Sequence, residues 1–337
     1  MTIWFKSELD ALLRQKDRLP HALLLKGPRG IGKQGFGVAL AQGLLCESPL
    51  PENGNGCGSC RSCAWLETGS HPDFRLLVPP TDGDTEAETG ESVKKTKPSA
   101  WTSIEQVREL HDFIHVSSHR GGRKVILVSP AEALNVSAAN ALLKNLEEPP
   151  PGTHFILVSH RPHRLPRTII SRCRQLSLQQ PDPATALEWL RAQGVADPEV
   201  ALAQCSGAPL LALAASEGDE LSGRRDFLSR IAPPDFDPMA VGEIYRDLPP
   251  ERFIGWLQKW TYDIVNRRML GSIRYNPDLA RELALIAGRT DPVTMLRLHR
   301  KLVREQRNIH HPLNNRLHLE SVLFAYAAAV NPQRRAA

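Results

Sequence analysis

A glycine-rich run at residues 27–33 has the residue types and spacing of a phosphate-binding loop. It fits the pattern G-x-x-x-x-G-K, in which glycines let backbone N–H groups converge on phosphate oxygens and the lysine adds positive charge. Apolar residues at 21–25 precede it and small, apolar residues at 34–45 follow it, which predicts a strand, a loop and a helix. The candidate nucleotide-binding residues are Gly27, Gly30, Gly32, Lys33 and Gln34.

The same pattern lacks the side chains that hold magnesium. A serine or threonine hydroxyl usually follows the lysine, and here the longer Gln34 follows it. Carboxylates are expected after a neighbouring buried strand, but the chain has Ser129 and Pro130 there, with Glu132 further along. We therefore expect efficient hydrolysis to be lost. Three alternatives stay open: ATP or ADP binding without efficient hydrolysis, an autonomous P-loop ATPase, and a turn that binds no nucleotide.

Four of the six cysteines lie close together in the sequence: Cys46, Cys57, Cys60 and Cys63. Tetrahedral zinc takes four thiolates, and gaps of two residues let a tight turn present successive sulfurs to one ion. Because the protein supplies all four ligands, we expect a structural zinc site without an open position for catalysis. The alternative is four free thiols in a reducing compartment. Cys173 and Cys205 are isolated, and we expect them to be small buried residues.

The first 180 residues have the pattern of an α/β domain. Apolar runs at 124–128 and 154–158 predict buried strands, and a helix is predicted between them at 137–148, where prolines end it. Strands that alternate with helices indicate a parallel sheet covered on both faces. The segment 79–100 is highly charged and poor in large apolar side chains, so we expect a mobile surface loop there.

Beyond residue 181 the predicted elements are all helical. We expect an α/β core at 1–180 with a zinc module at about 44–66, a small helical lid at 181–216 and an all-α collar at 217–337. The formal charge of +5 over 337 residues is mild and does not by itself indicate nucleic-acid binding. No apolar run has the roughly 18 residues of a membrane span, and the N-terminus lacks a signal-peptide pattern. These features predict a cytoplasmic protein.

Two patterns in predicted helices indicate a binding site less specifically. A basic stripe is formed by Arg297, Arg300, Lys301, Arg304 and Arg307. It is either a solvated helix face or a face that contacts phosphates or a partner. His111 and His115 lie four residues apart, but no third ligand completes a metal pattern, so we expect an ordinary polar face. The cysteines and the basic stripe together leave a zinc-dependent nucleic-acid-binding protein as an alternative function.

Four motifs follow one another along the first 180 residues. They are the strand that enters the glycine-rich loop, the four-cysteine insert, the run from Asn140 to Pro150, and Ser171-Arg172-Cys173. In this order they resemble the bacterial clamp-loader subunits of the AAA+ family. The resemblance implies an AAA+ P-loop core and a lid, followed by a collar domain through which subunits oligomerise into a ring.

The departures from the family pattern indicate a type of subunit. Motor subunits, gamma and tau, keep a threonine and an Asp-Glu pair where this chain has Gln34 and Ser129-Pro130. The family's Gly-Ser-Leu-Arg pattern in the lid corresponds to Gly207-Ala208-Pro209-Leu210, so the arginine that reads the nucleotide is absent. Ser171-Arg172-Cys173 is intact. These features resemble the non-motor, delta-prime type of subunit of bacterial DNA polymerase III.

This resemblance implies a role for Arg172 and a set of partners. The arginine would project into the ATP site of a neighbouring subunit, where a guanidinium neutralises charge that develops on the γ-phosphate. The chain would be a rigid stator beside gamma or tau and delta subunits. The complex would load the sliding clamp on primed DNA, so clamp and primer-template DNA are indirect partners.

Overall fold

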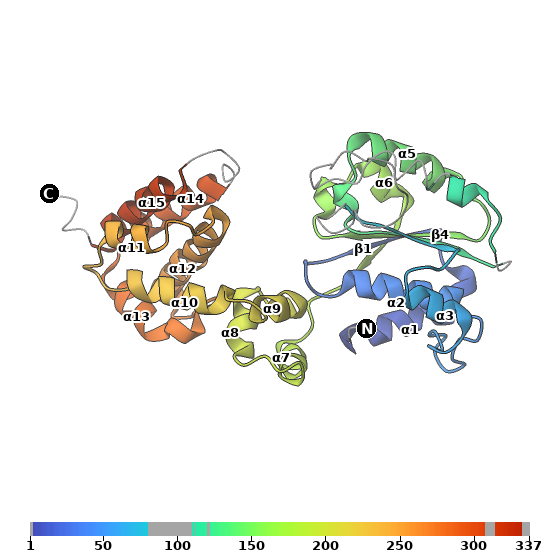
Figure 1. The fold of residues 1–337 in the computed structure, drawn as a ribbon, viewed down its shortest axis with the longest axis horizontal. Coiled ribbons are helices and arrows are strands. Elements are labelled where there is room, and N and C mark those ends of the chain that lie inside the picture. Colours follow the sequence, from blue (N-terminus) through green and yellow to red (C-terminus); the bar gives the residue numbers. More distant parts are fainter. Residues whose placement is uncertain (1–2, 80–109, 111, 120–121, 307–313, 332–337) are drawn as a thin grey trace, which may run out of the picture. The chain divides into compact units, whose positions relative to one another are not determined.

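The computed structural model describes residues 3–79, 110, 112–119, 122–306 and 314–331 (Figure 1). The chain divides into two compact units, Met1–Pro181 and Asp182–Ala337. Each unit has hydrophobic cores of its own.

A five-stranded sheet, in which every neighbouring pair of strands is parallel, forms the centre of the first unit. The strand order is β2-β3-β4-β1-β5, so β1 lies between β4 and β5. The strands are β1 Ala22–Lys26, β2 Phe74–Leu77, β3 Lys124–Val128, β4 Thr153–Ser159 and β5 Arg174–Ser177. β1, β3 and β4 are buried over almost their whole length, as in a parallel sheet covered on both faces.

Helices cover both faces of this sheet (Figure 1). Alternate strand residues point to opposite faces, so Leu24 and Phe155 share a core with α5 and α6, whereas Leu25 and Ile156 share one with α1 and α2. The helices are α1 Lys6–Arg14, α2 Lys33–Leu45, α3 Arg61–Glu67, α5 Val136–Glu147 and α6 Arg167–Arg172. Short 3-10 helices are η1 Ile3–Phe5, η2 Lys16–Arg18, η3 Ala131–Ala133 and η4 Pro162–Arg164.

The predicted strands at 21–25, 124–128 and 154–158 are confirmed within a residue at either end, as is the helix predicted at 137–148. The two edge strands, β2 and β5, were not predicted. Each has four residues, and β5 is mostly exposed. Such short edge strands lack the apolar run that marks a buried strand.

The second unit is entirely helical in its described part. Its helices are α7 Pro183–Ala192, α8 Pro198–Gln204, α9 Pro209–Ser216, α10 Glu220–Ile231, α11 Pro238–Ile244, α12 Pro250–Leu270, η5 Pro277–Leu279, α13 Ala280–Arg289, α14 Pro292–Glu305 and α15 Asn315–Val330. α7, α8 and α9 share a small core around Leu190 and Ala201. The remaining helices pack around Trp260 and Tyr326. The border between lid and collar at residues 216 and 217 stays a prediction.

A buried polar cluster ties α8 to the helices that follow it. Arg224 of α10 donates to Oδ1 of Asn276 at 2.6 Å and pairs with Asp278 at 2.5 Å. Gln204 of α8 donates to the same Asn276 oxygen at 3.0 Å, and Asp263 of α12 accepts the Asn276 backbone N–H at 2.8 Å. Charged groups buried in this way require their partners, so the cluster fixes α8 against α10, α12 and η5.

Some predictions fall outside the described residues. They are the mobile loop, of which only Pro79 is described, His111 of the histidine pair, and Arg307 of the basic stripe. Among the described residues no single helix is long and apolar enough to cross a membrane. The bent pair α8 and α9 passes that test only when the two are taken together.

Candidate functional site

The carboxyl ends of three strands bring the glycine-rich loop together with two other loops. β1, β3 and β4 are parallel, with β4 in the middle, so the residues that follow them meet at one edge of the sheet. The loop at 27–32 therefore lies near Ser129 and near the residues after Ser159, whose carbonyl accepts the Gly27 N–H at 3.3 Å. Ligands of open α/β sheets bind at such an edge.

Glycine geometry and the N-terminal segment hold the loop in shape. Gly30 and Gly32 have φ values of 77° and 92°, a region that favours glycine. Gly32 is the N-cap of α2. Trp4 of η1 donates its indole N–H to the carbonyl of Ile31 at 2.9 Å. The strand, loop and helix predicted around a phosphate-binding pattern are thus present, with an additional contact from the chain's beginning.

Lys33 points back into its own loop. Its Nζ donates to the carbonyl oxygen of Gly27 at 2.8 Å and to that of Pro28, and the residue is only 2% exposed. Burial lowers the pKa of Lys33 to about 8, and the Glu132 carboxylate opposes only part of this effect. To reach a phosphate, the ammonium group would have to turn away from these carbonyls.

The two positions that hold magnesium in a P-loop ATPase contact each other. The Ser129 hydroxyl, buried at the end of β3, donates to Oε1 of Gln34 at 3.2 Å. Both side chains are neutral, and neither offers a carboxylate oxygen, the ligand that Mg²⁺ sites usually include. The departures noted separately in the sequence are therefore parts of one contact.

Glu132 of η3 binds the loop that follows β4. Its Oε1 accepts the backbone N–H groups of His160 at 2.8 Å and Arg161 at 3.0 Å. Burial acts to raise the pKa of Glu132, but hydrogen bonds from backbone amides outweigh it and the pKa is lowered. Burial and the charge of Lys33 lower the pKa of His160 to about 4. An ionised carboxylate therefore fixes this loop beside the glycine-rich loop.

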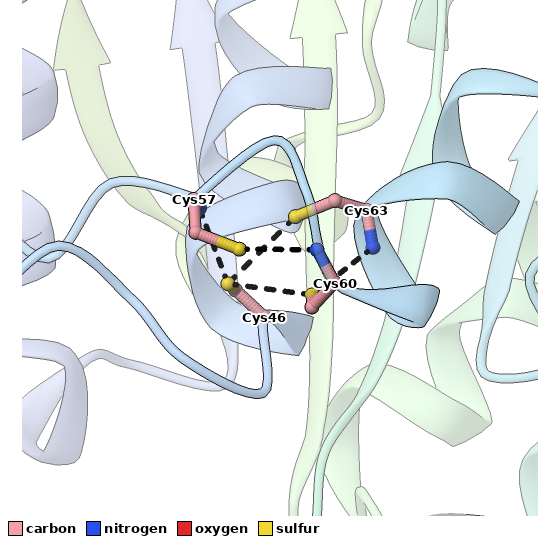
Figure 2. Close-up of side chains that lie close together, drawn as sticks. All are labelled: Cys46, Cys57, Cys60 and Cys63. Atoms are coloured by element: carbon pink, nitrogen blue, oxygen red, sulfur yellow. Dashed lines mark hydrogen bonds between the residues drawn. The ribbon is translucent and has the colours of Figure 1, made fainter.

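The four clustered cysteines converge on one point (Figure 2). Their sulfur atoms all lie within 4.8 Å of one another. Sγ of Cys46 lies 3.8 Å from that of Cys60 and 3.7 Å from that of Cys63. Four sulfurs placed about 2.3 Å from one zinc ion are about 3.8 Å apart at the corners of a tetrahedron. The described residues contain no other His, Cys, Asp or Glu group that could hold a metal, and this one fits zinc.

Backbone amides support these sulfurs. The N–H groups of Cys57, Cys60 and Cys63 donate to the sulfurs of Cys46, Cys57 and Cys60 at 3.3, 3.3 and 3.4 Å. These bonds act in favour of the thiolate form that binds metals, but burial outweighs them at Cys46 and raises the pKa of that thiol to about 12. Hydrogen bonds from Ser59 lower the pKa of Cys57 to about 6. Cys46 follows the last residue of α2 and Cys60 caps α3. An ion bound here would join the end of the helix after the glycine-rich loop to α3.

Arg172 is the last residue of α6, and its side chain is about one-third exposed (33%). Its Nη2 pairs with Oε1 of Glu147 at 2.5 Å, and its Nη1 donates to the carbonyl of Thr168 at 2.9 Å. Glu147 ends α5, where the helix dipole disfavours a negative charge. The guanidinium offsets that charge and lies along the protein surface. The adjacent Cys173 is buried, as expected.

Comparison with known proteins assigns the chain to a family. Residues 6–182 match the sequence family described as DNA polymerase III, delta subunit. The chain is 32% identical over 332 residues to DNA polymerase III subunit delta' of Pseudomonas aeruginosa, covering 93% of each protein. The chain belongs to the delta-prime family of DNA polymerase III subunits.

The chain also has more distant likenesses. The delta-prime chain is 34% identical over 165 residues to DNA polymerase III subunit tau of Escherichia coli, which is 49% of this chain and 22% of tau. Among solved structures, a gamma subunit-related protein of Thermotoga maritima aligns over 96% of this chain and 99% of that one, at 17% identity and a TM-score of 0.48. The assignment to the DNA polymerase III subunits rests on the family match and on the delta' relative.

Several contacts of this delta-prime chain were not found from the sequence. Trp4, Glu147 and His160 were not singled out, because each acts through a partner on a different element. For Gln34 and Ser129 a signal existed, since both depart from the ATPase pattern. Their contact needed the fold, which packs α2 against β3.

Proposed function

We propose that this chain is the non-motor stator subunit of its clamp loader and that Arg172 acts on the ATP of a neighbouring subunit. The contact between Gln34 and Ser129 carries the proposal. It takes up the two positions where a hydrolytic P-loop binds Mg²⁺, while the arginine of the Ser-Arg-Cys motif remains accessible to solvent. A subunit with that combination depends on another subunit's nucleotide for any part in hydrolysis.

The chain's own loop lacks the chemical requirements of ATP hydrolysis. Phosphoryl transfer needs Mg²⁺ to neutralise the β- and γ-phosphates and a residue to orient the attacking water. Gln34 and Ser129 supply no carboxylate, and Glu132 is engaged with backbone amides. The glycines and Lys33 are retained, which supports ATP or ADP as a structural ligand without efficient hydrolysis. Lys33 would have to release Gly27 first.

Arg172 has the chemistry for a role in trans. A guanidinium presents a planar fork of donors that suits phosphate oxygens. In the free chain Glu147 and Thr168 accept from that fork, and a half-exposed ion pair of this kind costs only about 0–1 kcal/mol to break. The triphosphate of a neighbouring ATP carries more negative charge than the carboxylate of Glu147. We therefore infer that Arg172 leaves Glu147 when the complex binds ATP.

The remaining features suit a rigid subunit. Zinc, when bound, cross-links four thiolates without taking part in a reaction, and Cys46, Cys57, Cys60 and Cys63 would hold it. The buried polar cluster includes a bond from Gln204 of the predicted lid to Asn276 of the predicted collar, where Arg224 also donates. The neighbours that we propose are gamma or tau and delta subunits, with the sliding clamp and primed DNA bound by the complex as a whole.

Substitution of Arg172 in the assembled complex tests the role in trans. The chain is combined with tau and delta, and ATP hydrolysis is measured with clamp and primed DNA present. Arg172→Ala should slow hydrolysis at the neighbouring site by on the order of 10³-fold in single-turnover measurements, and Arg172→Lys should not restore it, because lysine lacks the fork. Arg167→Ala, at the exposed start of the same helix, is the matched control. Equal rates for all variants would show that Arg172 has no such role.

A further inference from the structure

An open apolar pocket lies on the second unit, between α12 and α14. It encloses about 200 Å³, and its lining includes Val265, Met269 and Leu270 of α12 with Leu296 and His299 of α14. Leu270, Met269 and Leu296 are 76%, 65% and 43% exposed. Contiguous exposed apolar side chains of this size mark sites where another molecule binds. Neither Arg172 nor the zinc site is involved, since both lie in the other unit.

The exposed face of α14 beside the pocket is strongly basic. The residues that form the basic stripe in the described chain are Arg297, Arg300, Lys301 and Arg304, and all four are exposed. None of them makes an ion pair with another described residue. Arg300 lies one helical turn after Leu296, so its side chain stands next to the pocket mouth. No acidic residue occurs between 292 and 304. Asp291, just before the helix, interacts with Arg297, and Glu305, its last residue, lies 3.4 Å from His318, so the middle of this face keeps an excess of positive charge.

We infer that this pocket binds an acidic segment of a partner polypeptide, which inserts one bulky apolar side chain between α12 and α14 and sets carboxylates against the basic stripe. An apolar cavity of about 150 Å³ holds a benzene ring, so the pocket has room for one aromatic or branched aliphatic side chain. Buried anchors of that kind supply most of the affinity of an interface, and charges at the rim add specificity and speed of association.

The lining favours a polypeptide over a nucleic acid. Phosphates could bind the basic stripe, but they would leave the apolar pocket unfilled. Bases bind through exposed aromatic faces. The tyrosine in the lining, Tyr262, is half-buried and packs in a T-shaped pair with Tyr275, with ring centroids 5.4 Å apart. His299 bonds to the Thr261 hydroxyl at 2.9 Å, and burial lowers its pKa. It therefore brings no positive charge into the pocket at neutral pH.

Photo-crosslinking from the pocket identifies the occupant. Benzoylphenylalanine takes the place of Leu296 in the full chain, which is assembled with tau, delta, clamp and primed DNA, irradiated and analysed by mass spectrometry. We expect one crosslinked segment on a partner subunit, with Asp or Glu residues within a helical turn of the crosslinked apolar side chain. A crosslink to DNA, to a second copy of this chain or to a segment without carboxylates would overturn the inference, as would no crosslink.

Charge reversal at the pocket mouth tests the role of the basic stripe. Arg300→Glu should slow association with the crosslinked subunit by on the order of tenfold at low salt and weaken the dependence on salt. Arg281→Glu, an exposed arginine on α13, is the matched control for the same change in charge. On the partner, the acidic residue nearest the crosslink is then replaced by arginine. This partner variant should restore the association rate when it is combined with Arg300→Glu. Equal slowing by both variants, with unchanged thermal unfolding, would contradict the inference. Because neither variant touches Arg172, failure here would leave the proposed function intact.

Discussion

Arg172 and Glu147 form an ion pair whose side chains are 33% and 48% exposed. Water screens charges this open, so such pairs contribute about 0–1 kcal/mol. We expect Arg172→Ala and Glu147→Ala each to change the free energy of unfolding of the isolated chain by less than about 1 kcal/mol, measured by urea denaturation. A loss of several kcal/mol in Arg172→Ala would mean that the residue is structural, and a slower complex could then reflect misfolding.

Lys33 gives the isolated chain a dependence on pH that can be predicted in sign. Burial lowers its pKa to about 8 in the folded chain, whereas an unfolded chain titrates lysine at about 10.4. Between these values the unfolded chain binds more protons, so the stability contributed by Lys33 rises as pH increases from about 8 to about 10. Below about pH 8 both states are protonated and the contribution is constant and unfavourable.

The comparison of wild type with Lys33→Met isolates this effect. The difference in their free energies of unfolding should move in favour of the wild type between pH 7 and pH 10, when urea denaturation is repeated across that range. Lys144→Met, at an exposed position of α5, removes a lysine without removing a buried ammonium group and is the matched control. A flat difference for Lys33→Met would mean that Lys33 is not held against its loop.

At the scale of elements, the cysteine cluster joins the end of α2 to the start of α3. Metal analysis should find one zinc per chain. Cys60→Ser should lose it and unfold at a lower temperature, with a loss on the order of several kcal/mol, because the binding energy of a structural metal is also folding energy. Cys205→Ser changes the same chemical group in the second unit and should keep the zinc. Full zinc content in Cys60→Ser would rule out the four-thiolate site.

The buried polar cluster around Arg224 in the second unit provides a second test at the scale of elements. Arg224 is 1% exposed and pairs with Asp278, so Arg224→Ala leaves a buried carboxylate without its cation. Breaking a buried pair in this way costs about 3–5 kcal/mol. The neighbouring Arg225 is exposed, and Arg225→Ala should stay within about 0.5 kcal/mol of the wild type. Similar unfolding midpoints for both variants would mean that the pair of Arg224 with Asp278 does not hold α10 against η5.

For the whole molecule, the sequence predicts the elements whose signals are local. The apolar runs of β1, β3 and β4 and the glycine-rich loop are visible in a single sequence, because burial on both faces demands continuous apolar residues. β2 and β5 pair at the sheet edges with only four residues each, so their strand character depends on the neighbour they pair with. Sequence patterns record that dependence poorly.

The candidate sites, too, are visible in the sequence only where their signal is local. The four cysteines are marked by spacing alone, and the structure brings their sulfurs together. The losses at Gln34 and Ser129 are visible as departures from a pattern, but their contact is not. Glu147 could not be assigned to Arg172 from the sequence, since the pair depends on how α5 packs against α6. The apolar pocket likewise requires two helices that are separate in the sequence.

Steady-state ATP turnover by the isolated, purified chain is the most direct test of its proposed non-motor character. We predict no turnover above the background without enzyme, with or without Mg²⁺ and primed DNA, because Gln34 and Ser129 provide no carboxylate for the metal. Lys33→Ala should therefore give the same background rate. Sustained turnover that Lys33→Ala abolishes would contradict the non-motor role, since it would make this chain a motor in its own right.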